Sequence, residues 1–149
     1  MPSLTERAAI LQSQGIFIGG SARIFDIPGR KILMTLLASG LFPNSKVLDF
    51  GCGCLRGGYW LIHFLERDCY FGIEPDSEML HAGATILMEP EEIERKNPRF
   101  NFNHDFDFTV FGQTFDLLLP VPSGHMPVKN RSALCWMVLP RQLLTEEFS

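Results

Sequence analysis

The sequence predicts an α/β fold with a doubly wound, mostly parallel sheet, and three observations lead to this prediction. Short apolar runs that suit buried strands alternate with stretches of helical spacing. A glycine-rich segment at 51–58 directly follows the first of these runs. The chain has 149 residues, of which 46% are hydrophobic, so it can bury the core of one domain.

Two helices are expected in the N-terminal part of the chain. The first covers 4–13, because Ser3 and Glu6 have the spacing of a capping box. The second covers 30–39, with a break at Pro28-Gly29 before it and Gly40 after it. We therefore divide the chain into a helical extension (1–28), an α/β core (29–119) and an irregular tail (120–149).

Strands and helices alternate along the expected core. Residues 46–50 and 69–74 are the first two strands, and 59–67 is the helix between them. Asp76 can cap a further helix from Ser77 to about Leu87. The remaining expectations are a polar loop at 89–98, a third strand at 99–103 and a fourth at 115–119.

Charge and hydropathy exclude several classes of protein. The chain has 13 Lys and Arg residues against 17 Asp and Glu residues, which gives a net charge of −4. This acidic balance does not indicate binding to nucleic acid. Glu6 and Arg7 interrupt the N-terminus where a secretory signal needs an apolar core. No apolar stretch approaches the roughly 20 residues of a membrane span, so we expect a soluble cytoplasmic protein. The sequence does not predict an oligomeric state.

The cysteines do not indicate a metal site or a disulfide framework. Cys52 and Cys54 form a C-x-C pair, which lacks the C-x₂₋₄-C spacing of zinc ligands, and no second pair follows. We expect reduced thiols that are tolerated as small residues in a tight loop. No metal ligand is predicted.

The spacing of the glycine-rich segment distinguishes between possible ligands. Gly51, Gly53 and Gly57 form G-x-G-x-x-x-G, whereas the dinucleotide fingerprint G-x-G-x-x-G requires glycine at position 56, which is Arg56. Asp49 precedes the first glycine, where a carboxylate repels a pyrophosphate but attracts the ammonium of an amino-acid moiety. The pattern therefore disfavours a dehydrogenase that binds a nicotinamide cofactor.

Over residues 28–119 the sequence resembles the class I S-adenosylmethionine-dependent methyltransferases, whose first motif is D-x-G-x-G-x-x-x-G. The resemblance implies a Rossmann-like sheet, S-adenosyl-L-methionine as cofactor, and methyl transfer to an acceptor that the sequence does not identify. The cofactor-binding residues it implies are Asp49, Gly51, Cys52, Gly53, Gly57, Glu74, Pro75 and Asp105.

Two acidic residues have specific roles by this resemblance. Glu74, 21 residues after Gly53, would bind both ribose hydroxyls, and Asp105 would lie near the adenine. The structural alternatives are a carboxylate at Asp49 that caps the next turn and a charge at Glu74 beside a helix N-terminus. Arg56 would pair with a ligand carboxylate or serve a structural role.

No catalytic residue is predicted, because methyl transfer mainly requires positioning of the acceptor against the sulfonium. His63, His81, His104 and His125 have no spacing that indicates a proton relay.

The tail departs from the family pattern, which has a helix and a fifth strand there. Pro120, Pro122, Gly124, Pro127 and Pro140 interrupt every helical register. Two explanations remain open, a frameshift near 119–121 that truncates the family domain and a genuinely divergent tail. Two functions remain open as well, a methyltransferase and an inactive or partner-dependent cofactor-binding fragment.

Overall fold

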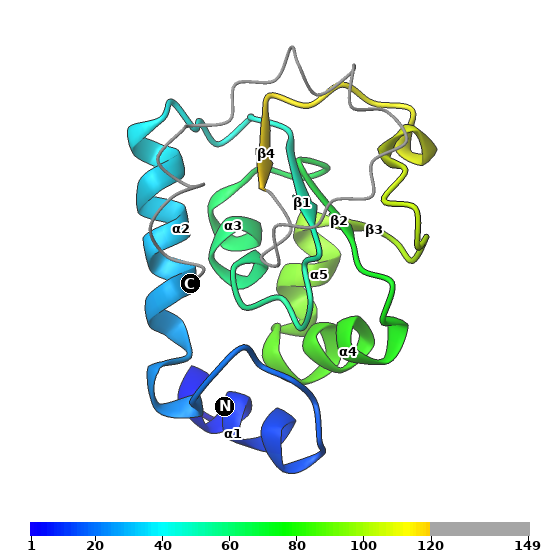
Figure 1. Cartoon of the computed structure of the whole chain (residues 1–149). Helices are drawn as coiled ribbons and strands as arrows, with labels where there is room; N and C mark the ends of the chain where they lie inside the picture. The colour runs from blue at the N-terminus through cyan, green and yellow to red at the C-terminus, as the bar shows by residue number, and fades with distance from the viewer. Residues whose placement is uncertain (120–149) are drawn as a thin grey trace.

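The computed structural model describes residues 1–119, so the predicted tail and both explanations for it lie outside the described residues. An α/β unit is formed by a central sheet with helices packed beside it (Figure 1). The helices are α1 (Leu4–Ser13), α2 (Asp26–Ala38), α3 (Gly58–Phe64), α4 (Ser77–Ala82) and α5 (Pro90–Lys96), with short helical turns η1 (Ala22–Ile24), η2 (Gly83–Leu87) and η3 (Phe108–Phe111). The strands are β1 (Val47–Phe50), β2 (Tyr70–Ile73), β3 (Arg99–Asn101) and β4 (Leu117–Leu119).

The four strands form one parallel sheet in the order β3-β2-β1-β4. Asp49 on β1 is paired with Gly72 on β2 and with Leu119 on β4. The prediction of parallel, adjacent first and second strands is confirmed. The chain moves outward from β1 to β3 and then returns to the other side of β1, so strand order reverses between β1 and β4. In open α/β sheets ligands bind at the carboxyl ends of the strands at such a reversal.

The two faces of the sheet are covered differently. The side chains of Val47 and Tyr70 face the helices, in a core that includes buried residues of α1, α2, α3, α4 and η2. The other face carries a cluster of aromatic and aliphatic residues, completed by η3. Its buried members are Leu48, Phe50, Phe71, Ile73, Phe108, Phe111, Phe115 and Leu118. Alternation of side chains along each strand explains this division.

The first predicted helix is confirmed together with its cap. The Ser3 hydroxyl accepts a hydrogen bond from the Glu6 amide at 3.2 Å, and the Glu6 carboxylate accepts one from the Ser3 amide at 2.7 Å. Arg7 on α1 is buried and forms an ion pair with Glu89 at 2.9 Å. Since Tyr59 on α3 also donates to Glu89 at 3.2 Å, this network fastens α1 to the rest of the core.

The expected break at Pro28-Gly29 is wrong, because α2 begins at Asp26 and runs through both residues. Proline is tolerated in the first turn of a helix, where its missing N–H would have no partner. Gly29 is required by packing, since a Cβ there would lie 2.5 Å from the Arg56 carbonyl oxygen. The predicted boundary between extension and core consequently falls inside α2.

The expected polar loop at 89–98 is also wrong, because 90–96 forms α5. Pro90 begins the helix, acidic residues occupy its first turn, and Arg95 and Lys96 occupy its last turn. These charges complement the helix dipole. Asn97 ends the helix in the left-handed conformation.

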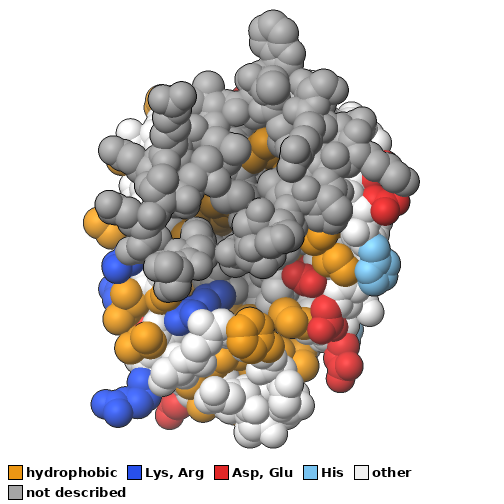
Figure 2. All heavy atoms as spheres, in the orientation of Figure 1, with side chains coloured by type: hydrophobic (Ala, Val, Ile, Leu, Met, Phe, Trp, Pro, Cys, Tyr) orange, Lys and Arg blue, Asp and Glu red, His pale blue; other side chains and the backbone are white. Residues whose placement is uncertain are grey.

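Within residues 1–119 no helix is both long and apolar enough to cross a membrane. On the face shown in Figure 2, the visible Lys and Arg side chains lie mainly on the left and the Asp and Glu side chains mainly on the right. The absence of a nucleic-acid partner and a cytoplasmic location stay predictions.

Candidate functional site

The glycine loop, residues 51–57, connects β1 to α3 at the carboxyl edge of the sheet. Gly51 and Gly53 have φ angles of 67° and 54°, in the left-handed region that favours glycine. The amide of Gly51 donates to the carbonyl of Ile73 at 2.8 Å, and that of Cys52 donates to the same oxygen at 3.3 Å. The loop therefore crosses from the end of β1 to the end of β2.

Glu74 follows β2 and is fixed against this loop. One carboxylate oxygen accepts a hydrogen bond from the Gly53 amide at 2.9 Å, and the other accepts one from the Asp76 amide at 3.0 Å. Pro75 separates Glu74 from Asp76, the N-cap of α4. A carboxylate has about four acceptor positions, so two bound amides leave capacity for further donors such as a diol.

Asp49 is buried at the end of β1 and pairs with a tyrosine. The Tyr70 hydroxyl donates to the Asp49 carboxyl at 2.6 Å. Burial raises the pKa of Asp49 to about 7, the Tyr70 hydrogen bond opposes the rise, and the charge of Glu74 adds to it. The carboxyl thus pairs with a side chain of β2, which differs from the alternative that it caps the next turn.

The two cysteines of the loop are buried and pack closely against other glycines. A Cβ at Gly72 would lie 2.8 Å from the Cys52 sulfur, and one at Gly83 would lie 2.3 Å from the Cys54 carbonyl oxygen. Desolvation raises the pKa of both thiols. In the part of the chain that the structure describes, no cluster of metal-ligating side chains is found.

Gly57 and Arg56 face the N-terminal part of the chain. A Cβ at Gly57 would lie 3.2 Å from the side chain of Ile32 on α2. The Arg56 guanidinium donates to three carbonyls, those of Gly19 at 2.8 Å, Ile24 at 3.1 Å and Phe25 at 2.8 Å. Of the two roles considered for Arg56, the structure supports the structural one.

We expect Arg56→Lys to destabilise the fold, because one ammonium cannot replace a planar guanidinium that reaches three carbonyls. The loss should be about 1–2 kcal/mol in the free energy of unfolding, measured by urea denaturation. Arg95→Lys is the matched control, since Arg95 forms an exposed ion pair with Glu92 on α5 and its replacement should cost less than about 0.5 kcal/mol. Equal losses in the two variants would contradict the role of Arg56.

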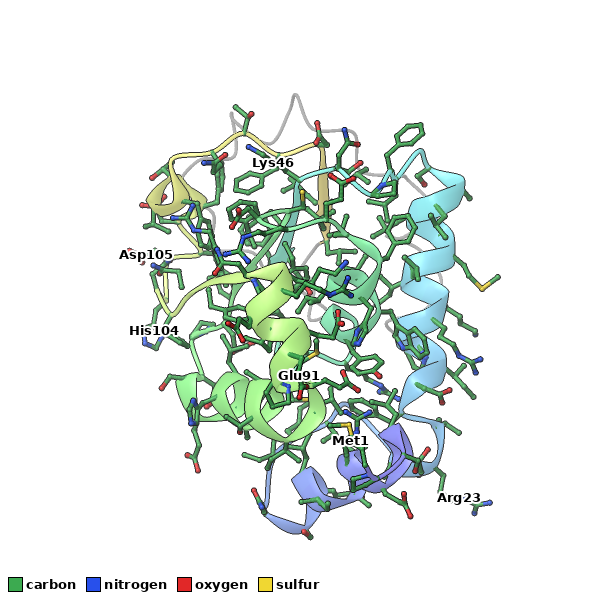
Figure 3. The ribbon with its side chains drawn as sticks, turned by 180° about the vertical axis from the view of Figure 1, so that it is seen from behind. Met1, Arg23, Lys46, Glu91, His104 and Asp105 are labelled. Atoms are coloured by element: carbon green, nitrogen blue, oxygen red, sulfur yellow. The ribbon has the colours of Figure 1, made fainter. Side chains whose placement is uncertain are left out.

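The loop after β3 carries the predicted Asp105. The Glu74 amide donates to the carbonyl of Asn101 at 3.1 Å, so this loop leaves the sheet beside Glu74. Asp105 is exposed, and Figure 3 shows it with His104 at the edge of the molecule opposite α2. The loop is held by Asn103, whose side chain contacts Asn101 and the backbone of Asp107. A role of Asp105 near the adenine stays a prediction.

Sequence reasoning missed two residues of the site. Tyr70, the partner of Asp49, lies on the same face of the sheet, because Val47 pairs with Tyr70 and Asp49 with Gly72. The available signal was a tyrosine within a strand expected to be buried, since a buried tyrosine needs a polar partner. Leu55 has a φ of 67° although it is buried and not glycine. Nothing in its residue type indicates that conformation.

Comparisons with known proteins find similar solved structures only. No protein-family model and no curated protein sequence matches the chain. The magnesium protoporphyrin IX methyltransferase of Synechocystis PCC 6803 with bound S-adenosylmethionine is 18% identical, with a TM-score of 0.49 over 65% of this chain and 44% of that one. The complex of the same enzyme with S-adenosylhomocysteine is 18% identical, with a TM-score of 0.47 over 65% of this chain and 42% of that one. The plantazolicin methyltransferase BpumL is 15% identical, with a TM-score of 0.42 over 83% of this chain and 50% of that one.

The matched part therefore spans half or less of the length of each of these enzymes.

Proposed function

We propose that the chain binds S-adenosyl-L-methionine at the glycine loop and serves methyl transfer to an acceptor. The observation that supports this most is the hydrogen bond between the Gly53 amide and the Glu74 carboxylate. This bond joins Gly53 and Glu74, which lie 21 residues apart in the sequence. Both residues belong to the pattern by which the sequence resembles the methyltransferases. The carboxylate, oriented by two amides, can accept from both hydroxyls of a ribose.

Charge favours S-adenosylmethionine over a dinucleotide at this loop. Asp49 and Glu74 interact electrostatically, and both are acidic. A pyrophosphate beside Glu74 and the ionised form of Asp49 would be repelled, whereas a ligand with an ammonium and a sulfonium would be attracted and would favour the ionised carboxyl. The reversal of strand order beside β1 supports a ligand site at the same edge of the sheet.

In this proposal the residues of the chain bind and orient the cofactor. Glu74 holds the ribose, the backbone of Gly51 and Gly53 permits close approach of the amino-acid moiety, and Asp49 supplies negative charge near its ammonium. The cofactor supplies an activated methyl group when it is bound. Methyl transfer then requires only that the acceptor is oriented against that methyl group.

Glu74→Ala should weaken binding of S-adenosylmethionine by about 1.5–3 kcal/mol, because it removes a charged acceptor from two hydroxyls. This corresponds to an increase in Kd of about 10- to 150-fold by calorimetric titration. Glu94→Ala, an exposed change on α5, should leave Kd unchanged.

Glu74→Gln separates the loss of charge from disturbance of the loop. Glutamine keeps the side-chain length and one acceptor oxygen, so it can hold one of the two amides that Glu74 holds, and the circular dichroism of this variant should match that of the unmodified protein. A folded Glu74→Ala or Glu74→Gln variant with unchanged Kd would leave Glu74 with a structural role only.

A further inference from the structure

Asp49 and Tyr70 form a buried pair at the base of the glycine loop. Asp49 is 7% exposed, Tyr70 is 2% exposed, and their side-chain oxygens are 2.6 Å apart. A Cβ at Gly58, the first residue of α3, would lie 2.7 Å from the Tyr70 hydroxyl oxygen. The pair is therefore fixed between two strands and the start of a helix.

The groups around this pair are neutral or acidic. Tyr70 faces Asp49 from β2, Cys52 from the loop, and Glu74 from the end of β2, while α3 contributes Gly58, which has no titratable side chain. Burial raises the pKa of the Cys52 thiol and of the Tyr70 hydroxyl well above their usual values, so both keep their protons near neutral pH.

The Asp49 carboxyl can change its charge between pH 5.5 and 7. Burial raises its pKa to about 7, so below that pH the carboxyl is mostly protonated in the protein without ligand. A cation at the loop would favour the ionised form. This attraction acts through space and does not require direct contact with the buried carboxyl.

We propose that Tyr70 is a positioning residue for Asp49, and that the ammonium group of the ligand binds at the glycine loop with release of the proton from the Asp49 carboxyl. This inference rests on the proposed function and adds a regulation of its site by pH. The O–H bond of Asp49 breaks and its proton passes to the buffer. Tyr70 keeps its own proton and donates a hydrogen bond to the resulting carboxylate.

The proposal predicts how affinity depends on pH. If Asp49 is ionised in the complex, the Kd for S-adenosylmethionine should fall roughly fifteenfold from pH 5.5 to pH 7. At pH 6, about 0.9 proton should be released for each ligand bound. This range lies below the titration of an α-amino group, at about 7.7–8.0, so the ammonium of the ligand is mostly charged throughout.

Calorimetric titration with S-adenosylmethionine in two buffers of different ionisation enthalpy counts the released protons. Asp49→Asn should remove the release. Tyr70→Phe removes a hydrogen bond that lowers the pKa of Asp49. The midpoint of the curve of proton release should therefore move to higher pH, with more protons released at pH 7 than in the unmodified protein.

Two controls make the result specific to this pair. Tyr59→Phe, which removes the other tyrosine hydroxyl of the chain, should leave the release curve in place, because Tyr59 contacts Glu89 and Arg7. Adenosine, which lacks the amino-acid moiety, should bind without release of a proton. Binding of S-adenosylmethionine with no proton release, identical curves for Tyr70→Phe and the unmodified protein, or equal release by adenosine would overturn the proposal.

Failure of the proposed function is recognised separately. If S-adenosylmethionine does not bind at all, the proposed function and the ligand-coupled release fail together. The role of Tyr70 is then tested in the free protein by carbon-13 NMR of labelled aspartate, with Asp49→Asn used for assignment. The Asp49 carboxyl should titrate near pH 7 in the unmodified protein and at a higher pH in Tyr70→Phe. Titration below pH 5 would contradict that role.

Discussion

Asp49→Asn should remove a large dependence of stability on pH. The folded protein holds a proton on Asp49 at pH values where the unfolded chain has released it, because the pKa rises from 3.8 to about 7 on folding. Stability contributed by this group is therefore fully present below about pH 4 and is lost as the pH rises through 7. The pKa difference corresponds to a loss on the order of 4 kcal/mol.

Urea denaturation at pH 4, 6 and 8 measures this effect. The free energy of unfolding of Asp49→Asn, relative to that of the unmodified protein, should rise with pH by this amount. Asp68→Asn is the control, since Asp68 is an exposed residue before β2 and should not reproduce the change. Parallel pH profiles for Asp49→Asn and the unmodified protein would show that Asp49 ionises normally in the folded state.

Gly83→Ala should destabilise the protein on the order of 3 kcal/mol, although alanine is the better helix former by about 1 kcal/mol. Gly83 begins η2 with helical angles, yet a Cβ there would lie 2.3 Å from the carbonyl oxygen of Cys54 and 2.8 Å from its Cα atom. Those atoms are backbone of the glycine loop, so relief requires movement of the loop itself.

Thr85→Ala is the control for Gly83→Ala, because it also introduces alanine into η2 but at an exposed position. Thermal melting should show a clear decrease for Gly83→Ala and a change of a few tenths of a kcal/mol for the control. An unchanged or increased melting temperature in Gly83→Ala would mean that η2 and the loop are not in the contact described.

Local signals predicted the elements whose structure depends on nearby residues. The capping box of Ser3 and Glu6 fixed the start of α1, and the apolar run before Gly51 identified β1. Hydrophobic periodicity missed α5, where a polar loop was expected, because the half-exposed residues of this helix are organised by charge rather than by an apolar stripe. The start of α2 was missed because proline was interpreted as a helix breaker without regard to its position in the first turn.

In the candidate site too, motif spacing predicted some residues, whereas other roles depend on contacts between segments distant in the sequence. The motif spacing identified Gly53 and Glu74, and the structure brings them into a direct hydrogen bond. The role of Arg56 could not be deduced, because its three carbonyl partners lie 31 to 37 residues earlier in the chain. The pairing of Tyr70 with Asp49 likewise required the register of β1 against β2.

The central claim, that S-adenosylmethionine binds at the glycine loop beside Glu74, is tested most directly by amide hydrogen exchange with and without the ligand. Added S-adenosylmethionine should slow exchange in peptides that cover 51–58 and 74–79, and nicotinamide adenine dinucleotide at the same concentration should not. No protection by S-adenosylmethionine, protection confined to other segments such as α1 or α5, or equal protection by the dinucleotide would contradict the claim.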